Sequence, residues 1–370
     1  MKKVLHILNM LLPSGAETML KNSAYLWEGY EKHILATLPD EGEYAETLEE
    51  AGYQIHHIYS QNKKDHFNRI RQFVLREQFE VVHIHCEGRG FEYACIMKMA
   101  GIKSIVRTVH NVFVYTGVQK YKRLFQRWIE RRIGVKYVAI GRSVYNNEMY
   151  WLKNKCYCII NNWCDEAVYQ LIPEDSRKRA REKLNVRDNT FCVVSVGNCN
   201  DVKNHEFIIE ALARLKKDFS EKIEGFSMVY FHVGSGVNEE EEKKFAQKLG
   251  VMDCIRFLGR QEPLMYLAAS NAYLMPSKFE GLSISGLEAI SVGIPTLFTD
   301  VAGLIDFKEI CIENVRFCNL EIDSFYEEFK NLYIDFLSGN LNFSQDQIKQ
   351  VRKFYSMDKS VKKYLAVYQV

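Results

Sequence analysis

The sequence predicts an α/β protein built from two parallel-sheet domains. The chain has 370 residues, enough for two domains that each bury a core of their own. Short β-rich segments alternate with longer amphipathic or polar segments, which is typical of βα units around a parallel sheet. The alternation stops in a polar stretch, residues 165–189, and then begins again. The βα pattern therefore occurs twice.

The predicted strands are short runs rich in apolar and β-branched residues. Those of the first half are Val4–Leu8, His33–Leu38, Val81–His85, Ser104–Val109, Tyr137–Ile140 and Cys158–Ile160. Those of the second half are Phe191–Val196, Met228–Val233, Ile255–Leu258, Ala272–Met275 and Pro295–Phe298. From about Asp323 the sequence indicates helices with aromatic anchors. We expect an N-terminal domain over residues 1–165, a C-terminal domain over 166–350, and a last helix, 351–370, that packs back on the first domain.

Composition and charge exclude several classes of protein. Hydrophobic residues make up 47% and charged residues 26%, as in soluble globular chains, and the net charge of +2 does not indicate nucleic-acid binding. The apolar run from Val4 to Leu12 resembles a signal peptide, but His6 and Asn9 interrupt it and it fits a buried first strand. No run approaches the roughly 18 apolar residues of a membrane span. We expect a cytoplasmic protein whose membrane contact, if it has one, is peripheral on the inner face.

The ten cysteines are scattered singly and are interpreted as buried, reduced thiols. Two groups of residues resemble metal sites. Cys156, Cys158 and Cys164 lack a second pair, and on a strand His83 and His85 share a face while Cys86 points the other way. The sequence therefore predicts no metal ligands.

Glycines and polar residues follow the predicted strands. They lie at 14–17, 87–90 and 110–111 in the first half, and at 197–198, 234–236 and 278–281 in the second. Ligands of open α/β sheets bind at the carboxyl ends of the strands, where glycine lets the backbone approach a phosphate. We expect two Rossmann-like domains facing across a cleft, with Gly234 bordering a nucleobase.

The segment 277–289 carries the clearest chemistry. Glu280 lies in the loop after the strand Ala272–Met275, and Glu288 lies in the helix that begins near Ser283. Backbone amides of Leu282 and Ser283 would point out of the helix N-terminus, which suits a diphosphate. The two carboxylates could accept hydrogen bonds from sugar and ribose hydroxyls.

This segment resembles the E-x7-E motif of the family 4 retaining glycosyltransferases, which have the two-domain GT-B fold. Further resemblances follow in family order over nearly the whole chain: the loop 14–17, the strand 81–85, the histidine-bearing segment 108–111, Phe257-Leu258-Gly259 and Gly293-Ile294-Pro295. The ordered set is much more specific than any one of its members.

The resemblance implies a role for each matching residue. Glu280 would contact the donor sugar and Glu288 the ribose, while His110 would lie beside the sugar that is transferred. Gly15 would approach the donor phosphates and the acceptor. Lys203 matches the lysine that binds the diphosphate. The donor would be a nucleotide-sugar, with UDP-sugar favoured, and no cofactor is implied.

One residue departs from the family pattern. The arginine expected after the second domain's first strand is Asn198, which brings no positive charge, so Lys203, the helix N-terminus and Arg260 would neutralise the diphosphate. The sequence contains no Asp-x-Asp motif. The resemblance thus implies a metal-independent, retaining transfer that depends on electrostatic stabilisation of the leaving group, without a glycosidase-type nucleophile.

The segment 120–132 predicts an amphipathic helix. Apolar residues at 121, 124, 125, 128 and 129 form one stripe, and the other face is basic. We expect the stripe to pack on the sheet of the first domain and leave the basic face in solvent. The alternative is that the basic face, with Arg127 and Arg131, also meets anionic lipid or a lipid-diphosphate acceptor.

Several functions remain open at this point. The favoured one is sugar transfer to a saccharide or lipid-linked acceptor in capsule, exopolysaccharide or O-antigen assembly. The alternatives are a non-catalytic nucleotide-sugar-binding scaffold subunit, and a related epimerase or phosphorylase. An NAD-dependent oxidoreductase is disfavoured because no G-x-G-x-x-G follows either first strand.

Overall fold

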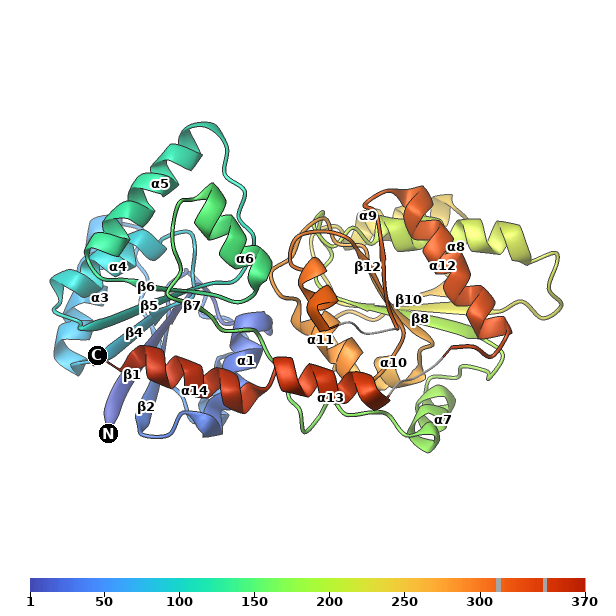
Figure 1. The fold of residues 1–370 in the computed structure, drawn as a ribbon, viewed down its shortest axis with the longest axis horizontal. Helices are drawn as coiled ribbons and strands as arrows, with labels where there is room; N and C mark the ends of the chain where they lie inside the picture. Colours follow the sequence, from blue (N-terminus) through green and yellow to red (C-terminus); the bar gives the residue numbers. More distant parts are fainter. Residues whose placement is uncertain (311–313, 342–344, 370) are drawn as a thin grey trace. The chain divides into compact units, whose positions relative to one another are not determined.

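The computed structural model describes residues 1–310, 314–341 and 345–369, so Cys311 lies outside the described residues. The chain divides into two compact units (Figure 1). The first contains residues 1–165 together with 355–370, and the second contains residues 166–354.

The first unit is built on a seven-stranded parallel sheet with the order β3-β2-β1-β4-β5-β6-β7. Its strands are β1 (Lys2–Leu8), β2 (Tyr30–Ala36), β3 (Gln54–His57), β4 (Val81–Ile84), β5 (Ser104–Val109), β6 (Lys136–Ala139) and β7 (Cys158–Ile159). Its helices are α1 (Gly15–Ser23), η1 (Ala24–Leu26), α2 (Ala45–Glu50), α3 (Lys63–Glu77), α4 (Gly90–Met99), α5 (Gly117–Arg132), α6 (Arg142–Asn146), η2 (Asn147–Trp151) and α14 (Met357–Tyr368).

The last helix, α14, belongs to this first unit although it is far away in sequence. The Tyr364 hydroxyl lies 3.0 Å from Thr108 Oγ1, and the Tyr368 hydroxyl lies 2.6 Å from His83 Nδ1. Both tyrosines are buried. The C-terminal segment thus completes the hydrogen bonding of two polar side chains inside the sheet.

The second unit is built on a six-stranded parallel sheet with the order β10-β9-β8-β11-β12-β13. Its strands are β8 (Phe191–Val196), β9 (Met228–Val233), β10 (Ile255–Phe257), β11 (Ala272–Met275), β12 (Thr296–Thr299) and β13 (Val315–Cys318). Its helices are α7 (Glu174–Lys183), α8 (Glu206–Phe219), α9 (Glu239–Lys248), η3 (Met252–Cys254), α10 (Leu264–Ala269), α11 (Ile284–Ser291), η4 (Ile305–Ile310), α12 (Ile322–Leu337) and α13 (Gln345–Phe354).

The core of the second unit lies where α8 and α12 pack together over the sheet. Phe191 on β8 contacts Phe329 and Tyr333 of α12, with ring centroids 5.8 and 5.3 Å apart. Ile208 and Leu212 of α8 belong to the same buried cluster. The predicted aromatic helix from about residue 323 is therefore confirmed as α12.

The α/β fold class with two parallel sheets is confirmed, and each predicted strand has a counterpart shifted by at most a few residues. Two strands were missed. The edge strand β3 leaves Gln54 and His57 exposed, so it has no apolar run. The edge strand β13 places Arg316 among partly buried residues, which hides its β character.

Each sheet reverses its strand order at one point. In the first unit the chain runs outward through β1, β2 and β3, and then returns to add β4 on the other side of β1. In the second unit the strand order reverses in the same way between the neighbouring strands β8 and β11. Loops that leave adjacent strands at such a point diverge and leave room for a ligand.

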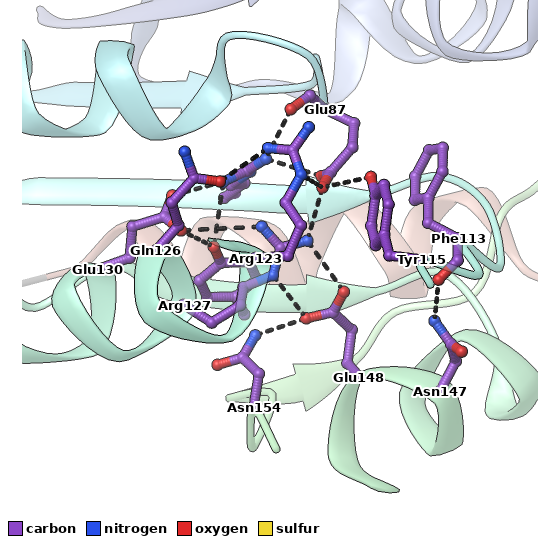
Figure 2. A network of polar contacts seen from close by, with 12 residues as sticks. Glu87, Phe113, Tyr115, Arg123, Gln126, Arg127, Glu130, Asn147, Glu148 and Asn154 are labelled. Atoms are coloured by element: carbon purple, nitrogen blue, oxygen red, sulfur yellow. Dashed lines mark hydrogen bonds and ion pairs between the residues drawn. The ribbon is translucent and has the colours of Figure 1, made fainter. Parts of the chain in front are cut away.

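The predicted orientation of the helix at 120–132 is wrong. On α5 the polar residues Gln126, Arg127 and Glu130 are buried, whereas the aromatic side chains of Phe125 and Trp128 are exposed. The inward face belongs to a network of charged side chains (Figure 2).

The network consists of ion pairs between two arginines and three glutamates that come from different parts of the first unit. Arg127 donates to Glu148 Oε2 at 3.0 Å and to Glu87 Oε1 at 2.9 Å (Figure 2). Arg107, on β5, donates to Glu87 Oε2 at 2.7 Å and forms an ion pair with Glu130. Burial alone would raise the pKa of Glu87, but Arg107, Arg127 and Arg123 together hold it below its usual value. Because Arg107 is buried in the sheet, the helix α5 faces it with the Glu130 carboxylate. The aromatic stripe of α5 therefore faces outward.

Loss of one charge should therefore destabilise the first unit. Arg127→Met should lower the free energy of unfolding by about 3–5 kcal/mol, because it leaves Glu148 buried without its ion-pair partner. Thermal unfolding followed by circular dichroism should show a decrease on the order of 10 °C in the transition of that unit. The control is Arg131→Met, since Arg131 is exposed on the same helix. Equal melting temperatures for the two variants would contradict the stabilising role of the network.

Candidate functional site

Glu280 lies in the loop between β11 and α11, at the point where the second sheet reverses its order. Its backbone N–H donates to Ala302 O at 3.0 Å, and its Oε1 accepts from Ser277 Oγ at 2.7 Å. Lys203 Nζ donates to the same Oε1 at 2.6 Å. Glu280 is almost completely buried, so this short ion pair lies in a partly desolvated environment.

Lys203 comes from the other loop at this reversal, between β8 and α8. Its N–H donates to Asn200, which folds the loop back. A Cβ at Gly197 would lie 2.9 Å from Lys203 Cε, so the lysine side chain packs directly on the glycine backbone. The Lys278 N–H donates to Val202 O at 2.8 Å and joins the two loops.

Glu288 is the most unusual carboxyl group of the site. It lies within α11 and is 6% exposed, and burial raises its pKa to about 8, opposed by a hydrogen bond from Tyr169. It is therefore largely protonated at neutral pH. Ser283 caps the same helix, with its Oγ accepting from the Gly286 N–H at 3.2 Å, and Leu282 precedes it as a buried residue.

Two glycines let the site loops approach one another closely. Gly234 follows β9 with φ of 144°, and a Cβ there would lie 1.8 Å from Gly197 O. Gly303 has φ of 88°, and a Cβ there would lie 2.3 Å from Glu280 O. No side chain fits at either position. Glycine is therefore required for the close backbone contacts between the loops that carry the polar residues.

Asn198 and Arg260 have more peripheral positions. Asn198 is exposed just after β8, one residue beyond Gly197. Arg260 is also exposed and follows β10, which is separated from β8 by β9. The structure thus brings together Lys203, Glu280 and the N-terminus of α11, with Arg260 further along the sheet edge.

In the first unit, His110 follows β5 and ends a chain of three imidazoles. His110 Nε2 lies 2.9 Å from His85 Nδ1, and His85 Nε2 lies 3.0 Å from His6 Nδ1. Burial lowers the pKa of His110 to about 4 and that of His6 to about 3, and burial with the neighbouring imidazoles holds the pKa of His85 well below its ordinary value. All three rings are neutral at physiological pH, so each has one N–H donor and one nitrogen acceptor. The tautomer of His110 therefore depends on the tautomers of the two other histidines.

Gly15 begins α1 and is exposed. The preceding Ser14 hydroxyl donates to Glu17, a buried carboxyl group whose pKa is raised by burial to about 7. The exposed start of this helix offers backbone N–H groups to an anion.

Sequence reasoning missed several of the residues that support the site. Ser277 and Gly303 contact Glu280, and Tyr169 contacts Glu288 from the polar stretch after the first unit. A serine three residues before the motif glutamate was a local signal for Ser277. Nothing local to Tyr169 indicates its contact, because more than a hundred residues separate it from Glu288.

Comparisons with known proteins find similarity to glycosyltransferases. The family model "Glycosyl transferases group 1" matches residues 176–354. A putative glycosyltransferase of Bacillus subtilis, EpsF, is 25% identical, with 81% of this chain and 79% of that protein covered. The capsular polysaccharide biosynthesis glycosyltransferase CapH of Staphylococcus aureus is also 25% identical, with coverage of 78% and 79%.

A third relative has a defined reaction in its name. It is the UDP-Gal:α-D-GlcNAc-diphosphoundecaprenol α-1,3-galactosyltransferase of Escherichia coli, 25% identical, with 63% of this chain and 61% of that protein covered.

The fold is shared with solved structures. Anabaena HepE, crystallised in complex with UDP, has a TM-score of 0.80 at 15% identity, and the match covers 99% of both chains. The second unit thus matches a glycosyltransferase family model, the relatives support a GT-B glycosyltransferase similar to family 4, and the chain shares the two-domain GT-B fold.

Proposed function

We propose that the protein transfers a sugar from a nucleotide-sugar to a saccharide or lipid-linked acceptor, with retention of anomeric configuration, in the assembly of a bacterial surface polysaccharide. The observation that carries the proposal is the Lys203–Glu280 pair at the sheet reversal, beside the N-terminus of α11. The chemistry is that of a site for a diphosphate bearing a sugar.

The donor binds in the second unit, with each group in a distinct role. Lys203 and the backbone amides at Leu282 and Ser283 bind the diphosphate, Glu280 accepts hydrogen bonds from the sugar, and Glu288 holds the ribose. Gly234 borders the nucleobase, while Asn198 and Arg260 contribute at the periphery. UDP-sugar is the favoured donor class, since HepE was crystallised with UDP.

Catalysis rests on fixed positive charge and needs no metal ion. Departure of the nucleoside diphosphate builds negative charge on its phosphate, which Lys203 and the helix N-terminus stabilise while the anomeric carbon gains oxocarbenium character. Asn198 supplies a hydrogen bond without a charge. Glu280 positions the sugar and is not a covalent nucleophile.

The first unit supplies the acceptor side. His110 is neutral, so it can donate or accept a hydrogen bond to a sugar hydroxyl without adding charge. Gly15 leaves the α1 N-terminus open to the acceptor. A lipid-diphosphate acceptor is supported by the Escherichia coli relative, whose name contains a diphosphoundecaprenol acceptor.

The acceptor proposal extends to peripheral membrane contact on the cytoplasmic side through α5. The aromatic residues Tyr121, Phe125 and Trp128 are 74%, 61% and 45% exposed and lie along one stripe. The exposed bases Arg131 and Arg132 flank the stripe, and Arg132 lies 4.9 Å from the Trp128 ring centroid. An aromatic stripe flanked by cations suits the interface of an anionic bilayer. Within the described residues, no helix is long and apolar enough to cross a bilayer.

The transferase proposal is tested first by donor binding. In a thermal-shift screen of UDP-, GDP-, ADP- and CMP-sugars without added metal, one nucleotide class should raise the melting temperature of the wild type. Lys203→Met should lower the affinity at least about tenfold, since a charged hydrogen bond to phosphate contributes about 1.5–3 kcal/mol. Lys278→Met is the control, because Lys278 is exposed on the neighbouring loop.

The stereochemistry of sugar transfer is determined from the glycoside that forms with the donor that binds. Proton NMR of the glycoside formed should show the same anomeric configuration as the donor. A product of opposite configuration would exclude the retaining mechanism, and donor binding without transfer or hydrolysis would favour a non-catalytic scaffold subunit.

The raised pKa of Glu288 predicts a pH dependence of stability. In the folded protein its pKa is about 8, above its ordinary value of 4.5. Its contribution is therefore fully present below about pH 4.5 and decreases as the pH rises through 8. Glu288→Gln, a neutral isostere, should unfold with a free energy a few kcal/mol higher than wild type at pH 8.5, since one pKa unit is about 1.4 kcal/mol. At pH 5 the difference should almost disappear. A difference that is the same at both pH values would rule out the raised pKa.

The membrane proposal is tested by vesicle sedimentation. The wild type should bind vesicles that contain phosphatidylglycerol more strongly than pure phosphatidylcholine vesicles. The double variant Phe125→Ser/Trp128→Ser should lose at least about tenfold in partitioning, because burying each aromatic side chain contributes roughly 1.5–3 kcal/mol. Tyr25→Ser, which removes an exposed aromatic residue outside α5, is the control. Equal binding of both variants would exclude α5 as the contact.

A further inference from the structure

Four side chains that can bind metal ions converge inside the second unit. Cys199 comes from the loop after β8, His205 is the N-cap residue of α8, His232 lies on β9 and Glu242 lies on α9. Each residue is at most 3% exposed. One donor atom from each, a thiol sulfur, two imidazole nitrogens and a carboxylate oxygen, lies within 4.8 Å of all the others.

The individual distances describe a compact cluster. His232 Nε2 lies 3.0 Å from His205 Nδ1 and 3.7 Å from Cys199 Sγ. The carboxylate of Glu242 lies 3.1 Å from His205 Nδ1 and 2.9 Å from His232 Nε2. In a tetrahedral zinc site with bonds of about 2.0–2.3 Å, ligand atoms are roughly 3.3–3.7 Å apart. Small outward movements of the side chains would accommodate the ion.

Protons alone do not satisfy this cluster. If both facing imidazole nitrogens carry hydrogen, two N–H donors lie 3.0 Å apart and repel each other. If one lacks hydrogen, its lone pair points towards a carboxylate oxygen of Glu242 at about the same distance. Glu242 Oε2 is buried and lies 2.9 Å from His232 Nε2, outside the geometry of a regular hydrogen bond. The remaining proton of the cluster is that of the Cys199 thiol, a weak donor 3.7 Å from His232 Nε2, so the protonated cluster is held by poor hydrogen bonds.

We propose that Cys199, His205, His232 and Glu242 bind one Zn²⁺ in a tetrahedral site. The cysteine ligates as a thiolate and releases its proton to solvent, as metal binding to a thiol requires. Two neutral imidazoles, one thiolate and one carboxylate balance the two charges of the ion, so the buried site is electrically neutral. Sulfur and imidazole ligands favour zinc over magnesium or calcium, which prefer oxygen.

The site is structural, because four protein ligands leave no open position for water or substrate. Cys199 and His205 lie on either side of Lys203 in the same loop, so the ion would hold that loop between β8, β9 and α9. This zinc takes no part in bond making and is independent of the metal-free transfer proposed above.

The experiment begins with the full-length protein purified without a metal-binding tag. Mass spectrometry of its metal content should find about one zinc per chain. After removal of zinc with a chelator, cobalt(II) should produce the intense visible bands of a tetrahedral ion and a near-ultraviolet thiolate-to-cobalt charge-transfer band. Cys199→Ser should lose the charge-transfer band, and Glu242→Gln should lose tight binding. Cys254→Ser is the control, since Cys254 is another buried thiol of the same unit.

Stability measurements separate metal binding from misfolding. Zinc should raise the melting temperature of the chelated wild type and of Cys254→Ser, but not that of Cys199→Ser or Glu242→Gln. All four proteins should have native circular dichroism spectra in chelator. An octahedral cobalt spectrum, absence of bound zinc, or equal binding by the variants would overturn the proposal. The last outcome would place the ion elsewhere, for example at His6, His83 and His85, the other group of close ligand atoms among the described residues.

Discussion

Parallel strands bring all their carboxyl ends to one edge of a sheet, and this constraint decides where the polar chemistry of the chain gathers. In the second unit the order reverses between β8 and β11, so two loops leave adjacent strands in different directions. Lys203 lies on one loop and Glu280 on the other, 77 residues apart in sequence and 2.6 Å apart in space. The ion pair follows from the topology, since no local element could bring these residues together.

The loops hold this geometry because their backbones are in direct contact. Gly234 lies against Gly197 O and Gly303 against Glu280 O, at distances that exclude a Cβ atom. Such contacts leave few alternative conformations for the segments that carry Lys203 and Glu280. Rigid loops suit a reaction that depends on preorganised charges, because little reorganisation remains to be done when the charge develops.

Much of the fold could be predicted from the sequence because buried parallel strands are continuous apolar runs, as in β8 and β9. The edge strand β3 lacked that signal. The amphipathic pattern of α5 identified two faces but not which one is buried. Arg107, in the middle of an otherwise apolar strand, was the available clue, since a buried arginine needs carboxylates from whatever covers it. At the site, Glu280, Glu288 and Lys203 could be nominated from a motif. The contact between Tyr169 and Glu288 could not, because it depends on how a distant segment packs.

The charges around Lys203 are nearly balanced. Lys203 is neutralised by Glu280, and the raised pKa of Glu288 keeps that carboxyl group largely uncharged at neutral pH. The α11 N-terminus adds a partial positive charge of roughly half a unit. In the function proposed above, a diphosphate competes with Glu280 for Lys203. The carboxylate released from the lysine then becomes free to accept hydrogen bonds from the donor sugar. In that function, binding of the phosphate and positioning of the sugar would be one exchange of hydrogen-bond partners.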